Sequence, residues 1–331
     1  MRIDRLQPIN LQHRRYLLAN ILMLLTVVLW GISFISIKIA VAEVPPVTLA
    51  LIRFVIASVL LWGLFRKIEP AAKIARADRP LMAVAGCLGI TLYFYFENTG
   101  VQLTTAVNAS LIVTIIPIIA IGLDVLFFRA PFSPLKAAGI AIAVTGMYLS
   151  VTANGKLDFS SEHFTGNLFV IGAMLAWTFY TLVNKSLQNK YTGLCMTTYQ
   201  TVTGTLFLLP LSLTEWSEWR VFSLTAFWHI LFLAVGCSVI CYVLYMYALK
   251  HLDVAITTLY LNLVPVVGVL GGYFILGEKV LPVQLAGGAL TLAAIVVMSF
   301  DRPGKMAAWS GQKNTLASGV NAEKQMEFPG K

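Results

Sequence analysis

Charged side chains are scarce in this sequence. Asp, Glu, Lys and Arg make up 12% of its 331 residues, whereas 58% are hydrophobic and the mean hydropathy is +0.79. Soluble domains carry about 25% charged residues, and a chain with so few cannot cover its apolar surface with polar groups. The scarcity excludes an ordinary water-soluble fold and predicts that lipid is the solvent.

Residues that bind metals or catalyse reactions are also few. The four cysteines lie in apolar stretches, where a thiol behaves as a small hydrophobic group: Cys87, Cys195, Cys237 and Cys241. The four histidines lie at segment ends or in loops, where a solvated imidazole is usual: His13, His163, His229 and His251. Neither set has the spacing of a zinc site or a disulfide framework, and the sequence has no Gly-x-x-x-x-Gly-Lys phosphate loop. We therefore expect no catalytic residue, no metal and no cofactor.

The 24 basic residues outnumber the 15 acidic ones, which gives a net charge of +9. They are scattered between apolar runs, so they do not indicate a surface for nucleic acid. Positively charged loops stay on the cytoplasmic side of a membrane. If the N-terminus is cytoplasmic, all but five of the Lys and Arg residues fall on the cytoplasmic side. The exceptions are Lys38, Lys156, Arg220 and Lys279, which fall outside, and Arg53, which falls within a span. The sequence predicts a multi-pass protein of the cell inner membrane with both termini in the cytoplasm.

Apolar stretches near the roughly 20 residues that cross a bilayer recur along the chain. Ten of them are predicted to be helices: 17–42, 47–65, 80–100, 103–128 and 134–152, then 166–187, 193–213, 225–249, 253–276 and 281–300. The predicted fold class is an all-α integral membrane protein of ten transmembrane helices.

The two sets of five helices are related to each other. Trp30 recurs 147 residues later as Trp177, and Pro117 recurs 148 residues later as Pro265. Because five crossings are an odd number, the second set enters the membrane from the opposite side. Two inverted five-helix repeats place a central cavity near the bilayer midplane, as in secondary transporters.

The chain is accordingly divided into five parts. They are a cytoplasmic N-terminal tail (1–16), the first repeat (17–152), an extracytoplasmic connecting loop (153–165), the second repeat (166–300) and a cytoplasmic tail (301–331). The last part is rich in Gly, Ser, Asn and Lys without apolar periodicity, which predicts disorder.

Short motifs in order along both halves resemble one family. The first half carries Trp30-Gly31, Ser33, Phe34, Lys38, Arg53-Phe54, Glu97-Asn98, the run Thr104 to Leu111, and Pro117. The second half carries Ala176-Trp177, Leu252, Ala255, Pro265, Gly277-Glu278 and Gly287. Over residues 20–300 the chain resembles the EamA family of the drug/metabolite transporter superfamily. The resemblance implies a carrier of small metabolites such as amino acids, with helices one to four and six to nine around a central cavity.

One position departs from the pattern of that family. Gly277-Glu278 follows the fourth helix of the second half, whereas Arg129-Ala130 stands at the same place in the first half. The role of the acidic residue that is missing at Ala130 is left open.

Aromatic and polar side chains share one face of the first and sixth helices. They are Trp30, Ser33 and Lys38 in the first, and Trp177 and Tyr180 in the sixth. Lipid offers polar atoms no partner, so such a stripe suits the wall of a cavity. Helix packing is the alternative, and both interpretations stay open for the two tryptophans.

Arg53 and Glu97 are charged residues inside predicted spans. A charge at that depth costs about 2.5 to 3.5 kcal/mol, so it must be paired or hydrated. With Lys38 at similar depth, the sequence predicts a network at the outer mouth. Its role is either a gate that contacts a substrate carboxylate or a structural ion pair.

Further residues complete the predicted site. The substrate pathway also includes Asn98, Asn108, Tyr247 and Asn262. Pro117 and Pro265 each remove a backbone donor in mid-helix, which predicts two kinks that act as hinges beside the cavity.

The predicted function is a secondary transporter, an exporter of a small organic metabolite such as an amino acid, that works by alternating access. A lipid scramblase or an accessory membrane subunit would share the repeat and is the alternative. A membrane-embedded enzyme fits less well, because the spans offer no cluster of acid, base or metal groups. Besides lipid and a small-molecule substrate the sequence predicts no partner, and it leaves the choice between monomer and homodimer open.

Overall fold

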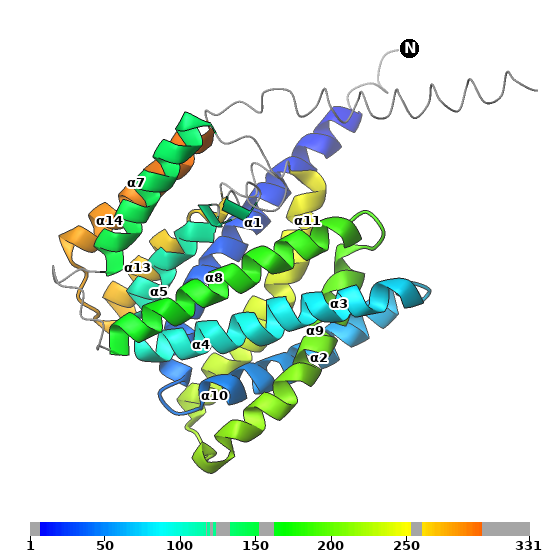
Figure 1. Ribbon diagram of the computed structural model, residues 1–331. Coiled ribbons are helices and arrows are strands. Elements are labelled where there is room, and N and C mark those ends of the chain that lie inside the picture. The colour runs from blue at the N-terminus through cyan, green and yellow to red at the C-terminus, as the bar shows by residue number, and fades with distance from the viewer. Residues whose placement is uncertain are drawn as a thin grey trace, which may run out of the picture.

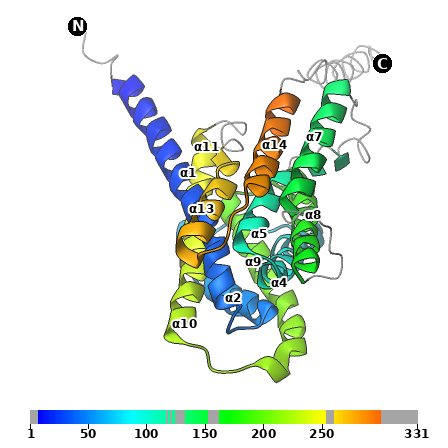
Figure 2. The same ribbon diagram turned by 90° about the vertical axis from the view of Figure 1, so that its left-hand side faces the viewer.

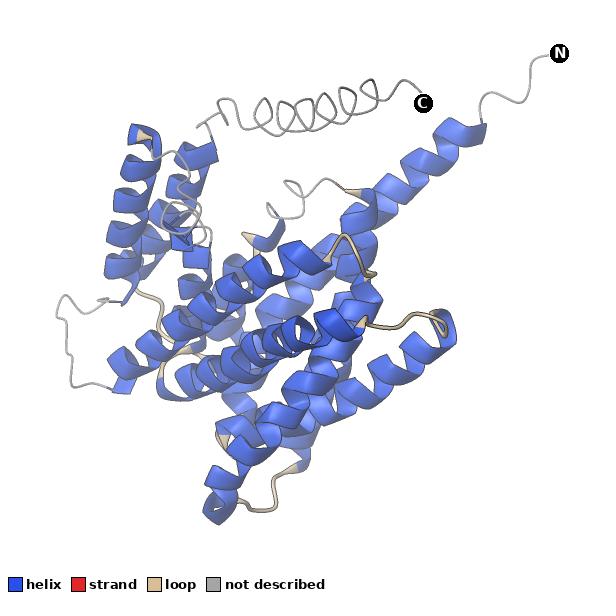
Figure 3. Ribbon diagram, turned by 45° about the vertical axis from the view of Figure 1, so that its right-hand side comes forward, coloured by secondary structure: helices blue, strands red, loops and turns tan. Residues whose placement is uncertain are grey.

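All regular secondary structure that the structure describes is helical, which confirms the predicted all-α class. The structure is a computed structural model, and it describes residues 7–116, 118–119, 122–123, 133–151, 162–252 and 260–299. Figure 3 shows the helices joined by short loops. Pro117, Ala130 and the predicted tail 301–331 lie outside the described residues.

The first half begins with a long helix that extends beyond the predicted span, from Gln7 instead of residue 17. Its described helices are α1 (Gln7–Ala40), α2 (Pro46–Ile68), η1 (Arg76–Asp78), α3 (Arg79–Gly86), η2 (Cys87–Leu92), α4 (Tyr93–Leu103), α5 (Ala106–Ile112), η3 (Val113–Ile115) and α7 (Pro134–Val151). Helices α3, η2 and α4 run on without a loop and together form the third predicted span.

The second half follows the same order. Its described helices are α8 (Glu162–Leu187), α9 (Gly193–Ser212), η4 (Leu213–Glu218), α10 (Leu224–Leu231), η5 (Phe232–Ile240), α11 (Cys241–His251), α13 (Val264–Leu276) and α14 (Pro282–Ser299). Helices α10, η5 and α11 are continuous, as α3, η2 and α4 are in the first half. Each of the ten predicted ranges therefore contains helix.

Several helices are long and apolar enough to cross a bilayer. Among the described residues, five qualify: His13–Ala40, Pro46–Ile68, Arg76–Leu103, His163–Asn184 and Leu224–Ala248. Four more apolar helices are shorter: Ala106–Ile115, Ala137–Leu149, Val264–Leu276 and Pro282–Ala294. These helices are consistent with a multi-pass membrane protein, while the number of ten crossings stays a prediction.

Most helices pack against a helix of the other half. Helix α1 packs on α11 and α13, α4 on α8, α2 on α9, and α5 on α13. Figures 1 and 2 show α7 and α14 side by side, and this pair also contacts α5 and η3 of the first half. The two halves therefore share one interior rather than forming two separate bundles.

Small residues set the distance between helices of different halves. Ser58 and Thr205, 147 residues apart, hydrogen-bond to each other at 3.0 Å where α2 meets α9. A Cβ atom on Gly146 of α7 would lie 2.6 Å from the carbonyl oxygen of Gly287 in α14. Only a residue without a Cβ atom allows the two helices to approach this closely.

Two π-helical segments occupy equivalent places in the halves. Segment η2 interrupts the third span, and η5 interrupts the eighth. A π-helix adds a residue to a turn and shifts the face that the following residues present. Neither segment was predicted, because nothing in the apolar pattern marks it.

Loops at opposite ends of the molecule tie the halves together. In the Asp78 tie, the Lys190 ammonium and the Tyr191 hydroxyl donate to the Asp78 carboxylate at 2.9 and 2.7 Å. In the Glu43 tie, the backbone N–H and hydroxyl of Ser223 donate to the Glu43 carboxylate at 2.6 and 2.7 Å. Glu43 and Lys190 are 147 residues apart, so the two ties are equivalent within the repeat.

Candidate functional site

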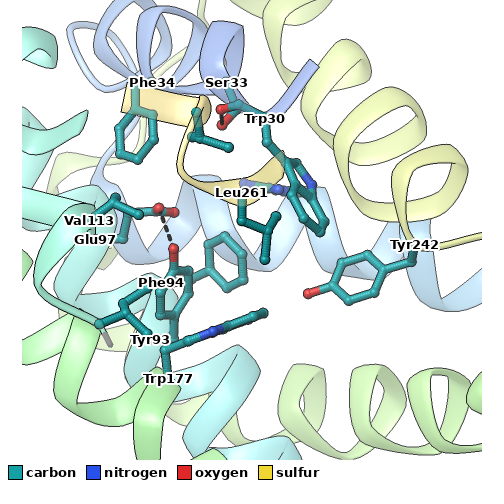
Figure 4. A pocket seen from close by; sticks show the side chains of 13 residues that line it. Trp30, Ser33, Phe34, Tyr93, Phe94, Glu97, Val113, Trp177, Tyr242 and Leu261 are labelled. Carbon is teal, nitrogen blue, oxygen red and sulfur yellow. Dashed lines mark hydrogen bonds between the residues drawn. The ribbon is translucent and has the colours of Figure 1, made fainter. Parts of the chain in front are cut away.

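A cavity of about 110 Å³ lies where helices of both halves meet. Pairs of residues 147 or 148 apart form much of its wall: Trp30 and Trp177, Phe94 and Tyr242, Val113 and Leu261, and Ile116 and Val264. Figure 4 shows the labelled side chains grouped around the open middle. The pairing places the cavity where the two repeats are related to each other.

The remaining lining residues come from the first half alone. They are Ser33, Phe34, Arg53, Tyr93 and Glu97. The walls of the cavity are therefore shared by the halves, whereas its two charged groups are not.

Arg53 lies on α2 with only 3% of its surface exposed. Its Nε donates to the Ser238 hydroxyl at 2.8 Å, and its guanidinium carbon lies 4.5 Å from the centre of the Phe94 ring. Its Nη1 is buried and has no hydrogen-bond partner. A buried donor without a partner costs free energy, most of all on a charged group, so this atom indicates a place for a ligand.

Glu97 lies on α4 with 4% of its surface exposed. The Tyr93 hydroxyl, one helical turn earlier, donates to its Oε1 at 2.7 Å, as the dashed line in Figure 4 shows. Arg53 and Glu97 both line the cavity. Within the described part of the chain, Arg53 and Glu97 form no direct ion pair. The ion pair found there is that of Lys190 with Asp78. Opposite charges therefore face one cavity from separate positions.

The two tryptophans make different contacts with their surroundings. Trp30 donates from Nε1 to the carbonyl of Cys237 at 3.1 Å, and its ring packs on Tyr242. Trp177 packs on Tyr93 and Tyr180, with ring centres 5.3 and 5.2 Å apart. Each ring thus lines the cavity and also packs between helices, so the alternatives left open by the sequence both hold.

Lys38 lies away from the cavity. Its ammonium donates to the carbonyls of Val101 and Gln102 at 2.9 and 3.0 Å, and also to that of Thr104. These carbonyls end α4, where a positive charge is favourable. The sequence predicted a network of Lys38 with Arg53 and Glu97, and the structure instead directs Lys38 to the end of α4.

Asn98 and Asn108 belong to contacts between helices. Asn98 donates to the carbonyl of Pro46, at the start of α2, at 3.0 Å. Asn108 accepts from the amide of Gln284 on α14 at 2.7 Å. Both side chains are buried, and neither lines the cavity.

Three other predicted residues also lie outside the lining. The Tyr180 hydroxyl donates to Gln200 at 3.0 Å, and the Tyr247 ring stacks on His251 at 4.3 Å. Asn262 lies in a turn just before α13. These positions do not test whether a substrate passes them, so their role stays a prediction.

Pro265 lies in the first turn of α13, where its missing N–H costs nothing. The chain turns at residues 262–263 just before it, so the helix is interrupted there rather than kinked in its middle. The equivalent place in the first half is the 3₁₀ turn Val113–Ile115. Pro117 itself lies outside the described residues.

Ser238 and Phe94 are among the site residues that sequence reasoning missed. Phe94 is 148 residues before Tyr242, so the repeat offset could have identified it. Ser238 lies in η5, and nothing in the sequence signals its contact with Arg53. Among the described residues, no three His, Cys, Asp or Glu side chains lie together in a way that could hold a metal.

Glu278 gives the position after α13 a structural role. Its carboxylate accepts from the backbone N–H groups of Ala106 and Val107 at 2.8 and 2.9 Å, at the start of α5. A carboxylate there satisfies donors that a helix leaves unpaired. The equivalent Ala130 carries no carboxylate, and it lies outside the described residues.

Comparisons with known proteins agree on one family of transporters. The profile of the EamA-like transporter family matches residues 17–152 and again residues 164–300. A probable terminal-alkyne amino-acid exporter of Streptantibioticus cattleyicolor is 30% identical over 84% of this chain and 92% of its own length. An uncharacterized transporter of Archaeoglobus fulgidus is 29% identical over 83% of this chain and 95% of its own.

Two further similarities are more distant. A probable amino-acid metabolite efflux pump of Salmonella typhimurium is 26% identical over 84% of this chain and 94% of its own. A solved crystal structure matches with a TM-score of 0.60 at 18% identity, over 85% of this chain and 96% of that one, which shows a shared fold. Since the family profile covers both halves, this chain belongs to the EamA-like transporter family.

Proposed function

We propose that the chain is a secondary transporter that exports a small organic metabolite, such as an amino acid, by alternating access. One observation carries the proposal: a cavity between the two halves is walled by equivalent residues of both and holds a buried Arg53 and Glu97. A polar site enclosed by two related halves can open to either side when one half rocks against the other. The names of two relatives as an amino-acid exporter and an efflux pump support the direction and the class of substrate.

The finer architecture is part of this proposal. Ten crossings form two inverted five-helix repeats, and the 147-residue separation of contacting residues such as Ser58 and Thr205 supports it. Both termini lie in the cytoplasm of a cell whose inner membrane holds the protein. The concentration of Lys and Arg in loops on one side supports that orientation.

Interrupted helices beside the cavity supply the moving parts. The 3₁₀ turn at Val113–Ile115 and the turn at residues 262–263 both adjoin residues of the cavity wall. Such interruptions are tolerated inside a membrane where the backbone lines a cavity. Pro117 and Pro265 follow these points, and they act as the hinges of the rocking movement.

Reconstituted protein tests the proposal against its alternative. Proteoliposomes are loaded with each of the twenty common amino acids in labelled form, and efflux is compared with that from protein-free vesicles. We expect protein-dependent efflux of at least one amino acid without lipid movement. Movement of a fluorescent phospholipid in the absence of any solute flux would instead establish a scramblase.

A comparison of cells tests the direction of transport. Cells that overexpress the protein should lose the transported metabolite from the cytoplasm and gain it in the medium. Accumulation inside the cells would overturn the assignment as an exporter, although not as a carrier.

A further inference from the structure

We propose that the cavity binds a free α-amino acid by both of its charged groups, the carboxylate on Arg53 and the ammonium on Glu97, and that Ser238 positions Arg53 for this. The inference rests on the proposed transport function and names how its substrate is recognised. It excludes amines, organic acids and amino acids with a blocked end as good substrates.

One nitrogen of the Arg53 guanidinium has a hydrogen-bond partner in the protein, and another has none. Nε is satisfied by the Ser238 hydroxyl, whereas Nη1 is buried without a partner and belongs to a residue that lines the cavity. A guanidinium matches the geometry of a carboxylate better than that of other groups. The rings of Phe54 and Phe94 lie 5.1 and 4.5 Å from the guanidinium carbon, and they carry no charge that would neutralise it.

Ser238 fixes the orientation of Arg53 from the opposite half. Its hydroxyl donates to the carbonyl of Leu233, five residues earlier, at 3.0 Å, and thereby turns its lone pair toward Arg53. Five residues is the spacing that the π-helical segment η5 provides. Because a hydroxyl carries no charge, the full positive charge of Arg53 remains for a ligand.

Glu97 supplies the complementary negative charge. One oxygen accepts from Tyr93, and the side chain lines the same cavity as Arg53. A ligand that is only an amine or only an acid would leave one of these two buried charges without a partner, which is strongly unfavourable. A zwitterion matches both charges at once.

The remaining space suits a modest apolar side chain. The cavity measures about 110 Å³, and one water needs roughly 10 to 15 Å³ by the same measure. Trp30, Trp177 and Tyr242 surround that space with rings (Figure 4). The site therefore favours amino acids with an apolar or aromatic side chain over those with a third charge.

The first experiment needs no variant. The amino acid with the highest flux in proteoliposomes is competed by its own amide, which lacks the carboxylate, and by its N-acetyl derivative, which lacks the ammonium. Each derivative should compete at least about tenfold more weakly than the free amino acid, because a site built to bind a polar group rejects an analogue without it. Equal competition by either derivative overturns the inference while the transport function stands. No flux of any solute overturns the proposed function itself.

Variants assign the two charges to residues. Arg53→Gln should abolish the preference over the amide, and Glu97→Gln should abolish the preference over the N-acetyl derivative. Arg14→Gln is the matched control, since Arg14 is exposed near the start of α1. If both charge variants change both preferences alike, the assignment of each group to its own residue is wrong.

Ser238→Ala tests the positioning role. It should raise KM and weaken the preference over the amide while the preference over the N-acetyl derivative stays. Ser238→Thr keeps the hydroxyl and should restore both values. Ser110→Ala removes an equally buried hydroxyl that bonds only within its own helix, and it should change neither preference. An unchanged amide preference in folded Ser238→Ala removes Ser238 from the site.

Discussion

The two halves of the molecule agree in shape and differ in chemistry. Equivalent positions supply Trp30 and Trp177 to the same cavity, yet Arg53 and Glu97 have the neutral counterparts Gln200 and Tyr245. The repeat therefore accounts for the walls of the cavity, and divergence between its copies accounts for the charges.

The counterpart of Arg53 shows how far the halves have diverged. Gln200 accepts from the Tyr180 hydroxyl at 3.0 Å and donates to Asn184 at 2.7 Å. Its amide is thus satisfied inside the protein, whereas Arg53 keeps a buried donor without a partner. A group satisfied by its neighbours stabilises the fold, while one left without a partner is available to a ligand.

Truncating each tryptophan of the equivalent pair should have the largest effect. Trp30→Ala and Trp177→Ala should each destabilise the protein by about 3 to 5 kcal/mol. Trp30→Ala should cost about 1 kcal/mol more, because it also loses the hydrogen bond to Cys237. Unfolding of the purified protein in detergent measures both. If Trp30→Ala loses less stability than Trp177→Ala, the hydrogen bond to Cys237 is not what distinguishes the two tryptophans.

Adding one methyl group should break the contact between the last helices of the halves. Gly146→Ala should destabilise by about 1 to 3 kcal/mol, since its Cβ would lie 2.6 Å from the carbonyl of Gly287. Gly63→Ala is the matched control, because nothing lies within 4 Å of a Cβ there. The control should be neutral or slightly stabilising, and equal losses in both variants would contradict the close packing of α7 on α14. Thermal unfolding in detergent compares them.

Removing the carboxylate of Glu278 should reduce stability by an intermediate amount. The first half offers no equivalent test, because Ala130 stands at that position. Glu278→Ala should cost about 1 kcal/mol, as loss of an N-terminal cap does, because α5 loses its acceptor. Lys279→Ala, at the exposed neighbour, should cost nothing measurable. Both are compared by chemical unfolding, and equal stability of the two variants would show that the cap does not stabilise α5.

The two ties should fail at opposite ends of the pH scale, with the smallest effects. Hydrogen bonds from Ser223 hold the pKa of Glu43 below its ordinary value of 4.5. The hydrogen bond to Asp78, and then its charge, hold the pKa of Lys190 above its ordinary value of 10.5. A carboxyl group with a lowered pKa stabilises the folded protein above pH 4.5, and this stabilisation is lost as the pH falls further. An ammonium group with a raised pKa stabilises it below pH 10.5, and that stabilisation is lost as the pH rises further.

Thermal unfolding across the pH range checks the comparison of the ties. The small deficit of Glu43→Gln should shrink as the pH falls below about 4.5 and vanish once Glu43 is protonated in the folded protein, and that of Lys190→Gln should shrink as the pH rises above about 10.5 and vanish once Lys190 is deprotonated there. Both residues are at the surface, so high salt should reduce both deficits. Deficits that do not depend on pH would show that charge does not stabilise these ties.

Several features of the fold were readable from the sequence because they follow from single residues and their periodicity. Apolar length predicted helix in all ten ranges, and the family resemblance is confirmed. Spacing along one helix placed Trp30 and Ser33 on one face, and both residues line the cavity.

Other features depended on contacts between distant residues. Lys38 shares its helix with Trp30, yet its long side chain reaches the end of α4. Asn98 adjoins Glu97 in the sequence, but the helical turn directs it to α2 instead of the cavity. Periodicity gives the angle between two side chains on one helix, and it does not say which neighbour each will meet.

The sequence by itself determined the solvent, the helices and the relation between the halves, because apolar content and a repeat offset are properties of the chain alone. Only the tertiary structure decided that Arg53 and Glu97 face one cavity, that Lys38 does not, and that Ser238 holds Arg53. The physical reason is that burial and pairing of a charge depend on which helices pack together, and residues 185 positions apart meet only after folding.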